Sequence, residues 1–205
     1  MRAAENVLVE KGHAALTLRS VAEACGLQVG NLSYYFRTKR DLVQALLQSL
    51  ITNYQGDMAE IEARDAADWE AMLTSVLFYW MKENQTRRTS RIYVELWSMG
   101  NNDPELREAV DRSYLNGRVR FRKIFKGMNP QLTDEDVEVL SVLAVSLMEG
   151  VMVFANEERP EVELMPQISA HVVDTLVHYA RATDRSRIAA LAARWRVHER
   201  SGGPK

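Results

Sequence analysis

The sequence predicts an all-α protein with a small N-terminal head of three helices, residues 1–47, and a larger helical body, residues 48–205. Apolar residues recur at helical spacing along most of the 205-residue chain, and no alternating pattern is strong enough to indicate a strand. Capping residues, glycines and prolines separate these segments at helix-like intervals. With 46% hydrophobic residues, the chain can bury a core in one or two domains.

The head is expected to contain a helix-turn-helix. Residues 2–11 form the first helix, which Gly12 ends. Thr17 is the N-cap of a second helix that stops at Gly26, because glycine adopts the left-handed conformation without a steric penalty. A turn of roughly three residues then leads to a third helix over about residues 28–35.

The outer face of the third helix is nearly uncharged and rich in hydrogen-bonding groups, which suits base edges and phosphate oxygens in a major groove. Lys39 follows in the first turn of the next helix, where a cation and free backbone N–H groups together bind phosphate. We expect Tyr34 and Lys39 to contact phosphates, and Gln28, Asn31 and Tyr35 to contact base edges. The predicted DNA contacts are Thr17, Arg19, Gln28, Val29, Gly30, Asn31, Ser33, Tyr34, Tyr35 and Lys39. The alternative is an ordinary polar surface on two small helices.

Packing inside the head depends on a few small and apolar residues. Ala22 is small where the second and third helices cross, and Leu27, Leu32 and Phe36 should pack back against it. Cys25, the only cysteine, is expected to be a small buried hydrophobe at this contact, and it excludes an intrachain disulfide.

This segment resembles the tetracycline-repressor (TetR) family of bacterial regulators over about residues 3–47, and the body resembles it in helix layout only. The resemblance rests on the order and spacing of Gly12, Ala15, Thr17, Val21, Ala22, Gly26, Gly30, Asn31, Leu32, Tyr34, Phe36, Lys39 and Leu42. The first helix is shorter than the family pattern and only Arg2 remains of its basic arm, so the chain either starts late or is truncated. Val29 and Ser33 also differ from the commoner family residues.

Charge is distributed unevenly. The net charge is −2, but residues 1–45 hold six Lys/Arg against four Asp/Glu, which is consistent with local phosphate contact. We find no long uncharged apolar run and no signal-peptide pattern, so we expect no membrane span and a cytoplasmic location.

The body is expected to consist of helices with recognisable ends. Pro104 suits a first helical position, and Thr133 is followed by three acidic residues that favour a helix N-terminus. The expected segments are 38–64, 68–84, 87–100, 104–126, 133–155, 165–181 and an extra amphipathic helix over 184–199, with a frayed tail over 201–205.

Two of these helices predict a homodimer. The segment 137–155 is apolar on almost every side and therefore must be buried on several sides, and the segment 168–180 carries a broad apolar stripe. A four-helix interface between two chains would bury the apolar faces of both segments, and the TetR resemblance also implies such an interface. The predicted interface residues are Leu143, Leu147, Val151, Val172 and Leu176. The alternative is a single thick core.

The body also predicts a ligand cavity walled by aromatic side chains. Glu149 is the only charge between Val139 and Asn156, so it must pair, protonate or serve a ligand, and a polar or cationic inducer would suit it. Glu95 is a second candidate, although Arg91 could neutralise it. The predicted set is Phe78, Trp80, Tyr93, Glu95, Trp97, Tyr114, Phe121 and Glu149. The alternatives are aromatic residues that only fill the core and a Glu149 paired with an arginine.

These features predict a dimeric DNA-binding regulator, and the TetR resemblance implies a repressor that a small-molecule inducer releases from its operator. The other hypothesis is a helical dimeric adaptor that binds protein. We expect no enzyme activity, cofactor or metal, because the four histidines are scattered and no nucleophile or phosphate-loop motif is present.

Overall fold

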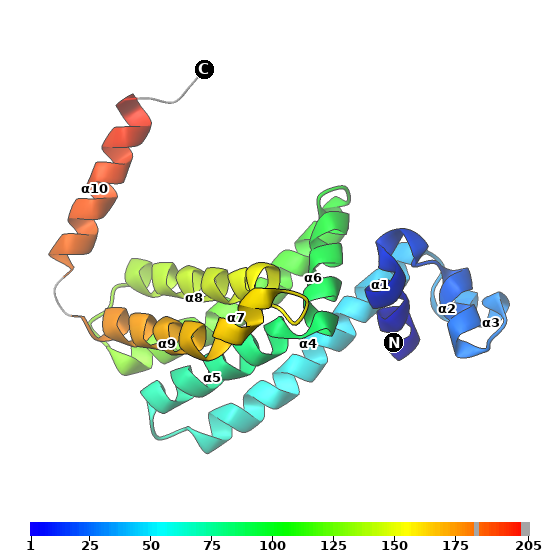
Figure 1. The fold of residues 1–205 in the computed structure, drawn as a ribbon, viewed down its shortest axis with the longest axis horizontal. Helices are drawn as coiled ribbons and strands as arrows, with labels where there is room; N and C mark the ends of the chain where they lie inside the picture. The colour runs from blue at the N-terminus through cyan, green and yellow to red at the C-terminus, as the bar shows by residue number, and fades with distance from the viewer. Residues whose placement is uncertain (183–184, 202–205) are drawn as a thin grey trace.

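The computed structural model describes residues 1–182 and 185–201, and this part of the chain is helical with no strands (Figure 1). The predicted all-α fold is confirmed. The elements are α1 (Arg2–Ala15), α2 (Leu18–Cys25), α3 (Val29–Tyr35), α4 (Lys39–Arg64), α5 (Trp69–Gln85), α6 (Arg87–Gly100), α7 (Pro104–Met128), α8 (Asp134–Phe154), the 3-10 helix η1 (Pro160–Leu164), α9 (Met165–Arg181) and α10 (Ser186–Ser201).

Helix ends follow the local chemistry of the sequence. Thr17, Thr38 and Thr133 are the N-caps of α2, α4 and α8, each within a reciprocal capping box. Gly26 ends α2 in the left-handed conformation, with φ of 67°. Gly12, with φ of 75°, kinks α1 rather than ending it, since one further helical turn follows to Ala15.

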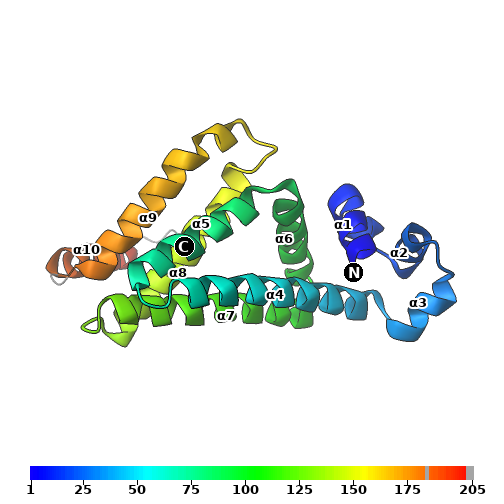
Figure 2. The same cartoon turned by 90° about the horizontal axis from the view of Figure 1, so that it is seen from below.

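Two hydrophobic cores hold the molecule together. The body core lies between α5, α7, α8 and α9 and includes Phe121 and Phe125. The second core combines α1–α3 and the first half of α4 with α6 and the start of α7. Because α4 runs unbroken from the head along α7, the expected division after residue 47 falls inside one helix and one core (Figure 2).

α8 corrects the expectation that no long apolar run exists. Its length and mean hydropathy of 2.0 would suffice for a membrane span by composition alone. In the protein α8 packs against α5, α7 and α9, and it buries Leu140, Ala144 and Met148 among them. Its apolar character is therefore explained in part by burial within one protomer.

Three local expectations differ from the structure. Cys25 and Leu27 are exposed, because the buried stripe of α2 ends at Ala22 and the chain turns away at Gly26. η1 replaces part of an expected loop. α10 stands away from the body in Figure 1, whereas its expected start at Asp184 and the expected tail beyond Ser201 lie outside the described residues.

Candidate nucleic-acid interface and ligand cavity

The outer face of α3 is almost fully exposed. Leu32 is its only buried residue, and it anchors the helix in the head core. Tyr34 and Tyr35 are 84% and 74% exposed, and their rings meet edge to face with centroids 5.2 Å apart. Two large rings left in solvent on one short helix form an apolar patch that a binding partner would cover. Gln28, Val29, Gly30 and Asn31 are exposed on the same helix or at its cap.

Gly30 and Ser33 differ in whether the fold of the chain already uses them. A Cβ atom added to Gly30 would meet nothing within 4 Å, so the fold of this chain does not require glycine there. A requirement for close backbone approach would therefore come from a partner. The Ser33 hydroxyl donates to the Val29 carbonyl at 3.0 Å, so it is already used inside α3.

The charged and capping candidates are also engaged within the chain. The Thr17 hydroxyl accepts from the Ser20 amide at 3.0 Å, which assigns it a capping role. Arg19 and Glu23, both exposed, pair at 3.0 Å along α2. The Lys39 ammonium donates to the His13 carbonyl, so it ties the start of α4 to the end of α1.

The junction between head and body is lined with ion pairs, most of which involve α6. His13 in α1 pairs with Glu95 in α6, and its backbone amide donates to the same carboxylate at 3.1 Å. Glu5 in α1 is buried and pairs with Arg88. These contacts place Glu95 at the head–body junction.

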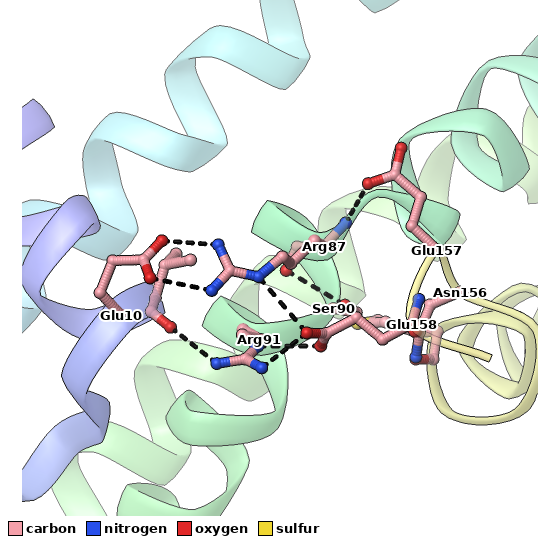
Figure 3. A network of polar contacts seen from close by, with 9 residues as sticks. Glu10, Arg87, Ser90, Arg91, Asn156, Glu157 and Glu158 are labelled. Carbon is pink, nitrogen blue, oxygen red and sulfur yellow. Dashed lines mark hydrogen bonds and ion pairs between the residues drawn. The ribbon is translucent and has the colours of Figure 1, made fainter.

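A second cluster joins α1, α6 and the loop after α8 (Figure 3). Arg87 forms two contacts with Glu10, of 2.5 and 2.9 Å, and reaches Glu158 at 3.3 Å. Arg91 contacts Glu158 at 2.6 and 2.9 Å and donates to the Val9 carbonyl at 3.2 Å. The adjacent guanidinium groups lower the pKa of Glu10 and Glu158. Arg91 therefore pairs with Glu158 and leaves Glu95 to His13.

The body contains a small cavity of about 70 Å³ between α4, α5, α6, α7 and α8. Of the predicted ligand residues, Trp80, Tyr93, Tyr114 and Glu149 line it. The other lining residues are Ile51, Tyr54, Gln55, Asn84, Ser113, Asn116, Gly117 and Arg120. The sequence analysis assigned no residue of α4 to the cavity. Tyr54, an aromatic residue among the polar residues 52–57, was the available signal.

A chain of hydrogen bonds connects the cavity to α6. The Trp97 indole donates to the Tyr114 hydroxyl at 2.8 Å, and that hydroxyl donates to the Glu149 carboxylate at 3.0 Å. Burial raises the pKa of Glu149 to about 7, although its hydrogen bonds partly oppose this shift. Burial also raises the pKa of Tyr114, Tyr93 and Tyr54. Among the described residues, Glu149 forms no ion pair with an arginine, lysine or histidine.

Four predicted ligand residues do not line this cavity. Phe121 is fully buried in the body core and packs edge to face on Trp80, with centroids 5.6 Å apart. Phe78 is exposed on the outside of α5, and Glu95 lies at the head–body junction. Trp97 contacts Tyr114 but does not itself line the cavity.

The predicted interface residues divide into two groups. Val151, Val172 and Leu176 are buried in the core of a single protomer, since they face α5 and α7 rather than solvent. Leu143 and Leu147 are only partly buried. The exposed apolar residues of α8 are Val139, Val142, Val153 and Phe154.

Two family models of bacterial transcription regulators match successive parts of the chain. Residues 1–46 match the model for bacterial regulatory proteins of the tetR family, and residues 69–178 match that for the C-terminal domain of BetI-type transcriptional repressors. The HTH-type transcriptional regulator TtgR and the probable regulator ArpR, both from Pseudomonas putida, are each 31% identical over 96 residues. Each alignment covers 45% of this chain and 46% of the relative, so the chain matches about half of the length of these two regulators.

Solved structures share the fold at low identity. A transcriptional regulator from Rhodococcus sp. Rha1 superposes with a TM-score of 0.71 at 17% identity, covering 86% of this chain and 91% of that one. A transcriptional regulator from Saccharomonospora viridis, solved in complex with choline, has a TM-score of 0.68 at 16% identity, covering 86% and 93% of the two chains.

Proposed function

Because the chain belongs to the TetR family of bacterial regulatory proteins, we propose that it is a DNA-binding transcriptional repressor which a small-molecule inducer releases from its operator. The observation that carries this proposal is the surface of α3. This short helix, which Leu32 anchors in the head core, exposes two tyrosine rings and the amide of Asn31, and its N-cap Gln28 exposes a second amide. Its exposed Gly30 has no structural role in the fold. Such a helix fits a major groove, where uncharged donors and acceptors discriminate between bases.

The active form is a homodimer that acts in the cytoplasm. Each head reads one half-site, and half-sites lie about one helical turn of DNA, roughly 34–36 Å, apart. The exposed valines of α8 support an interface there, because an apolar helix face left in solvent is a favourable surface for a second copy. Leu143 and Leu147 lie at the edge of the same interface.

The inducer binds in the body cavity. The fold can hold a small organic molecule, since the Saccharomonospora viridis neighbour was solved with choline. α6 supports communication with the head, because it carries Tyr93 at the cavity and Arg88 and Glu95 at the contacts with α1. A ligand that repositions α6 therefore changes the placement of the head.

Other function classes receive less support. The family and the fold are those of transcription regulators rather than of enzymes. A protein-binding adaptor is not favoured, because it has no use for a glycine and amide side chains on an exposed helix next to a lysine that can bind phosphate.

Selection from a pool of random DNA duplexes tests the proposal. The wild-type protein should enrich a two-fold symmetric sequence and bind it about a thousandfold or more tighter than a scrambled duplex at physiological salt. Binding without sequence preference, or no binding, would overturn the proposed function. The double variant Tyr34→Ala, Tyr35→Ala should fold normally and fail to enrich any sequence.

A further inference from the structure

The cavity is lined by the carboxylate of Glu149, which has no counter-ion in the part of the chain that the structure describes. Arg120 lines the same cavity, but its guanidinium contacts Glu62 at 2.5 Å. Arg88, on α6, is engaged by Glu5. Tyr114 supplies a hydrogen bond to Glu149, which does not neutralise a charge. A buried carboxylate in this position must take up a proton or meet a cation that enters from outside.

Aromatic rings from four helices line the cavity together with this carboxylate. Tyr54, Trp80, Tyr93 and Tyr114 come from α4, α5, α6 and α7, and all four line the cavity together with Glu149 of α8. The face of an aromatic ring attracts a cation, most strongly in a site shielded from water. Rings combined with one carboxylate disfavour an anion, and an uncharged molecule brings no positive charge to balance the ionised carboxylate.

The size of the cavity limits what it can enclose. Its volume of about 70 Å³ is far below the roughly 300–1,000 Å³ of sites that hold drug-sized ligands. However, Ile51, Gln55 and Asn116 also line a groove of about 650 Å³ between α4 and α7, which extends to Tyr35 and Phe36 of the head. The cavity therefore accepts a head group, and any longer substituent extends into the groove.

We propose that the ligand of this regulator is an organic ammonium cation whose charged head lies in the cavity against Glu149 and the four rings, and whose substituent follows the α4–α7 groove. This inference rests on the proposed function, since it names the chemical class of the inducer. It assigns Glu149 as the counter-ion, and Tyr54 as a cage residue contributed by the helix that leads to the head.

Proton competition follows from this arrangement. The groups that face Glu149 from the other helices are Tyr54, Tyr93 and Tyr114, whose raised pKa values keep them neutral, and Arg120, which is paired. Glu149 is therefore the group that titrates near neutrality, with a pKa of about 7. A cation binds its ionised form, so affinity should fall about tenfold between pH 8 and pH 6.

The test uses the full-length protein, two cations and one uncharged analogue. Tetramethylammonium and butyltrimethylammonium are titrated by calorimetry at pH 8 and pH 6, with ionic strength held constant by sodium chloride. tert-Butanol serves as an uncharged molecule of similar shape. We expect both cations to bind at least about tenfold tighter than tert-butanol at pH 8, with the weaker binding at pH 6.

Two variants separate a specific site from general effects. Glu149→Gln should lose most of the cation affinity and all of its dependence on pH, whereas Glu163→Gln, which removes an exposed carboxylate of η1, should behave like the wild type. If Glu149→Gln fails to fold, the comparison of cations with tert-butanol in the wild type still decides the outcome. Equal affinity for tert-butanol, or no cation binding at millimolar concentration, would overturn the inference.

Failure of the inference and failure of the proposed function are distinguishable. DNA selection tests the head without any ligand, so sequence-specific DNA binding without cation binding would reject only the ligand class. Cation binding without sequence-specific DNA binding would reject the regulator and leave the cavity as a cation site.

Discussion

Lys39 is the residue at which phosphate binding and the head–body junction meet. It occupies the first turn of α4, and its ammonium donates to the His13 carbonyl. Both features place a positive charge at a helix N-terminus with free backbone N–H groups, which is a favourable phosphate site. We predict that Lys39→Ala weakens binding to every DNA sequence and reduces the salt slope of log K by about 0.9.

Fluorescence anisotropy at several salt concentrations measures this slope. The matched control is Lys82→Ala, which removes an exposed lysine of α5 in the body and should leave the slope unchanged. An unchanged affinity and slope in Lys39→Ala would show that the assigned docking of the head is wrong.

Glu149 makes the stability of the protein depend on pH. Its pKa rises from 4.5 to about 7 on folding, so between these values the folded state binds more protons than the unfolded state. The free energy of unfolding therefore falls as pH rises through this window, by roughly 2 kcal/mol between pH 5.5 and pH 8. In the Glu149→Gln variant this fall in the free energy of unfolding with rising pH should be absent.

Urea denaturation at the two pH values tests the prediction, since the difference between wild type and variant isolates one group. A variant with the same pH dependence as the wild type would mean that Glu149 ionises normally in the folded protein.

Single residues also mark where sequence reasoning succeeds and fails. Thr17, Thr38 and Thr133 could be predicted as caps because capping involves neighbours within three residues. Burial of Cys25 was predicted wrongly, since spacing places it on the buried face while the chain leaves that face at Gly26. Burial depends on distant elements that local spacing does not specify.

At the scale of elements, α8 is the helix with two different apolar faces. One packs into the body core, and the other exposes Val139 and Val142, the latter at 42%. We predict that Val142→Glu yields a folded monomer, because the charge would be buried only in the dimer. DNA affinity should fall with the loss of the second head.

Light scattering coupled to size-exclusion chromatography gives the oligomeric state. Leu176→Glu provides the contrast: this side chain is 0% exposed within one protomer, so the variant should unfold rather than dissociate. A Val142→Glu protein that remains dimeric would place the interface elsewhere.

The helices themselves were predictable to within a few residues, because glycine, proline and threonine signals mark their ends. Which face of each helix is buried could not be predicted in the same way. Periodicity showed that α8 is apolar on almost every side and that α9 carries a broad apolar stripe. It could not tell which apolar residues meet α5 and α7 and which meet solvent. For this reason Val151 and Val172 were assigned to an interface although the protomer itself buries them.

The whole molecule joins the cavity to the DNA-reading surface through α6 and α4. α6 contributes Tyr93 to the cavity and pairs with α1 through Glu95, while α4 contributes Tyr54 and begins at Lys39. The cluster around Arg87 and Arg91 adds the loop after α8 to the same junction (Figure 3). The sequence could predict a head, a body and aromatic residues within the body, but not that Tyr54 of α4 would line the same cavity as Glu149.

The central claim is that a cation in the cavity weakens DNA binding by the head, and operator binding measured with the cavity filled tests it most directly. The labelled operator obtained by selection is bound by the wild type, and butyltrimethylammonium is added at constant ionic strength. We predict an operator affinity at least about tenfold lower at saturation, within the usual range of allosteric coupling, and no change for Glu149→Gln. Calorimetry shows when the cavity of the wild-type protein is saturated with the cation. An operator affinity that is unchanged at that point would contradict the account.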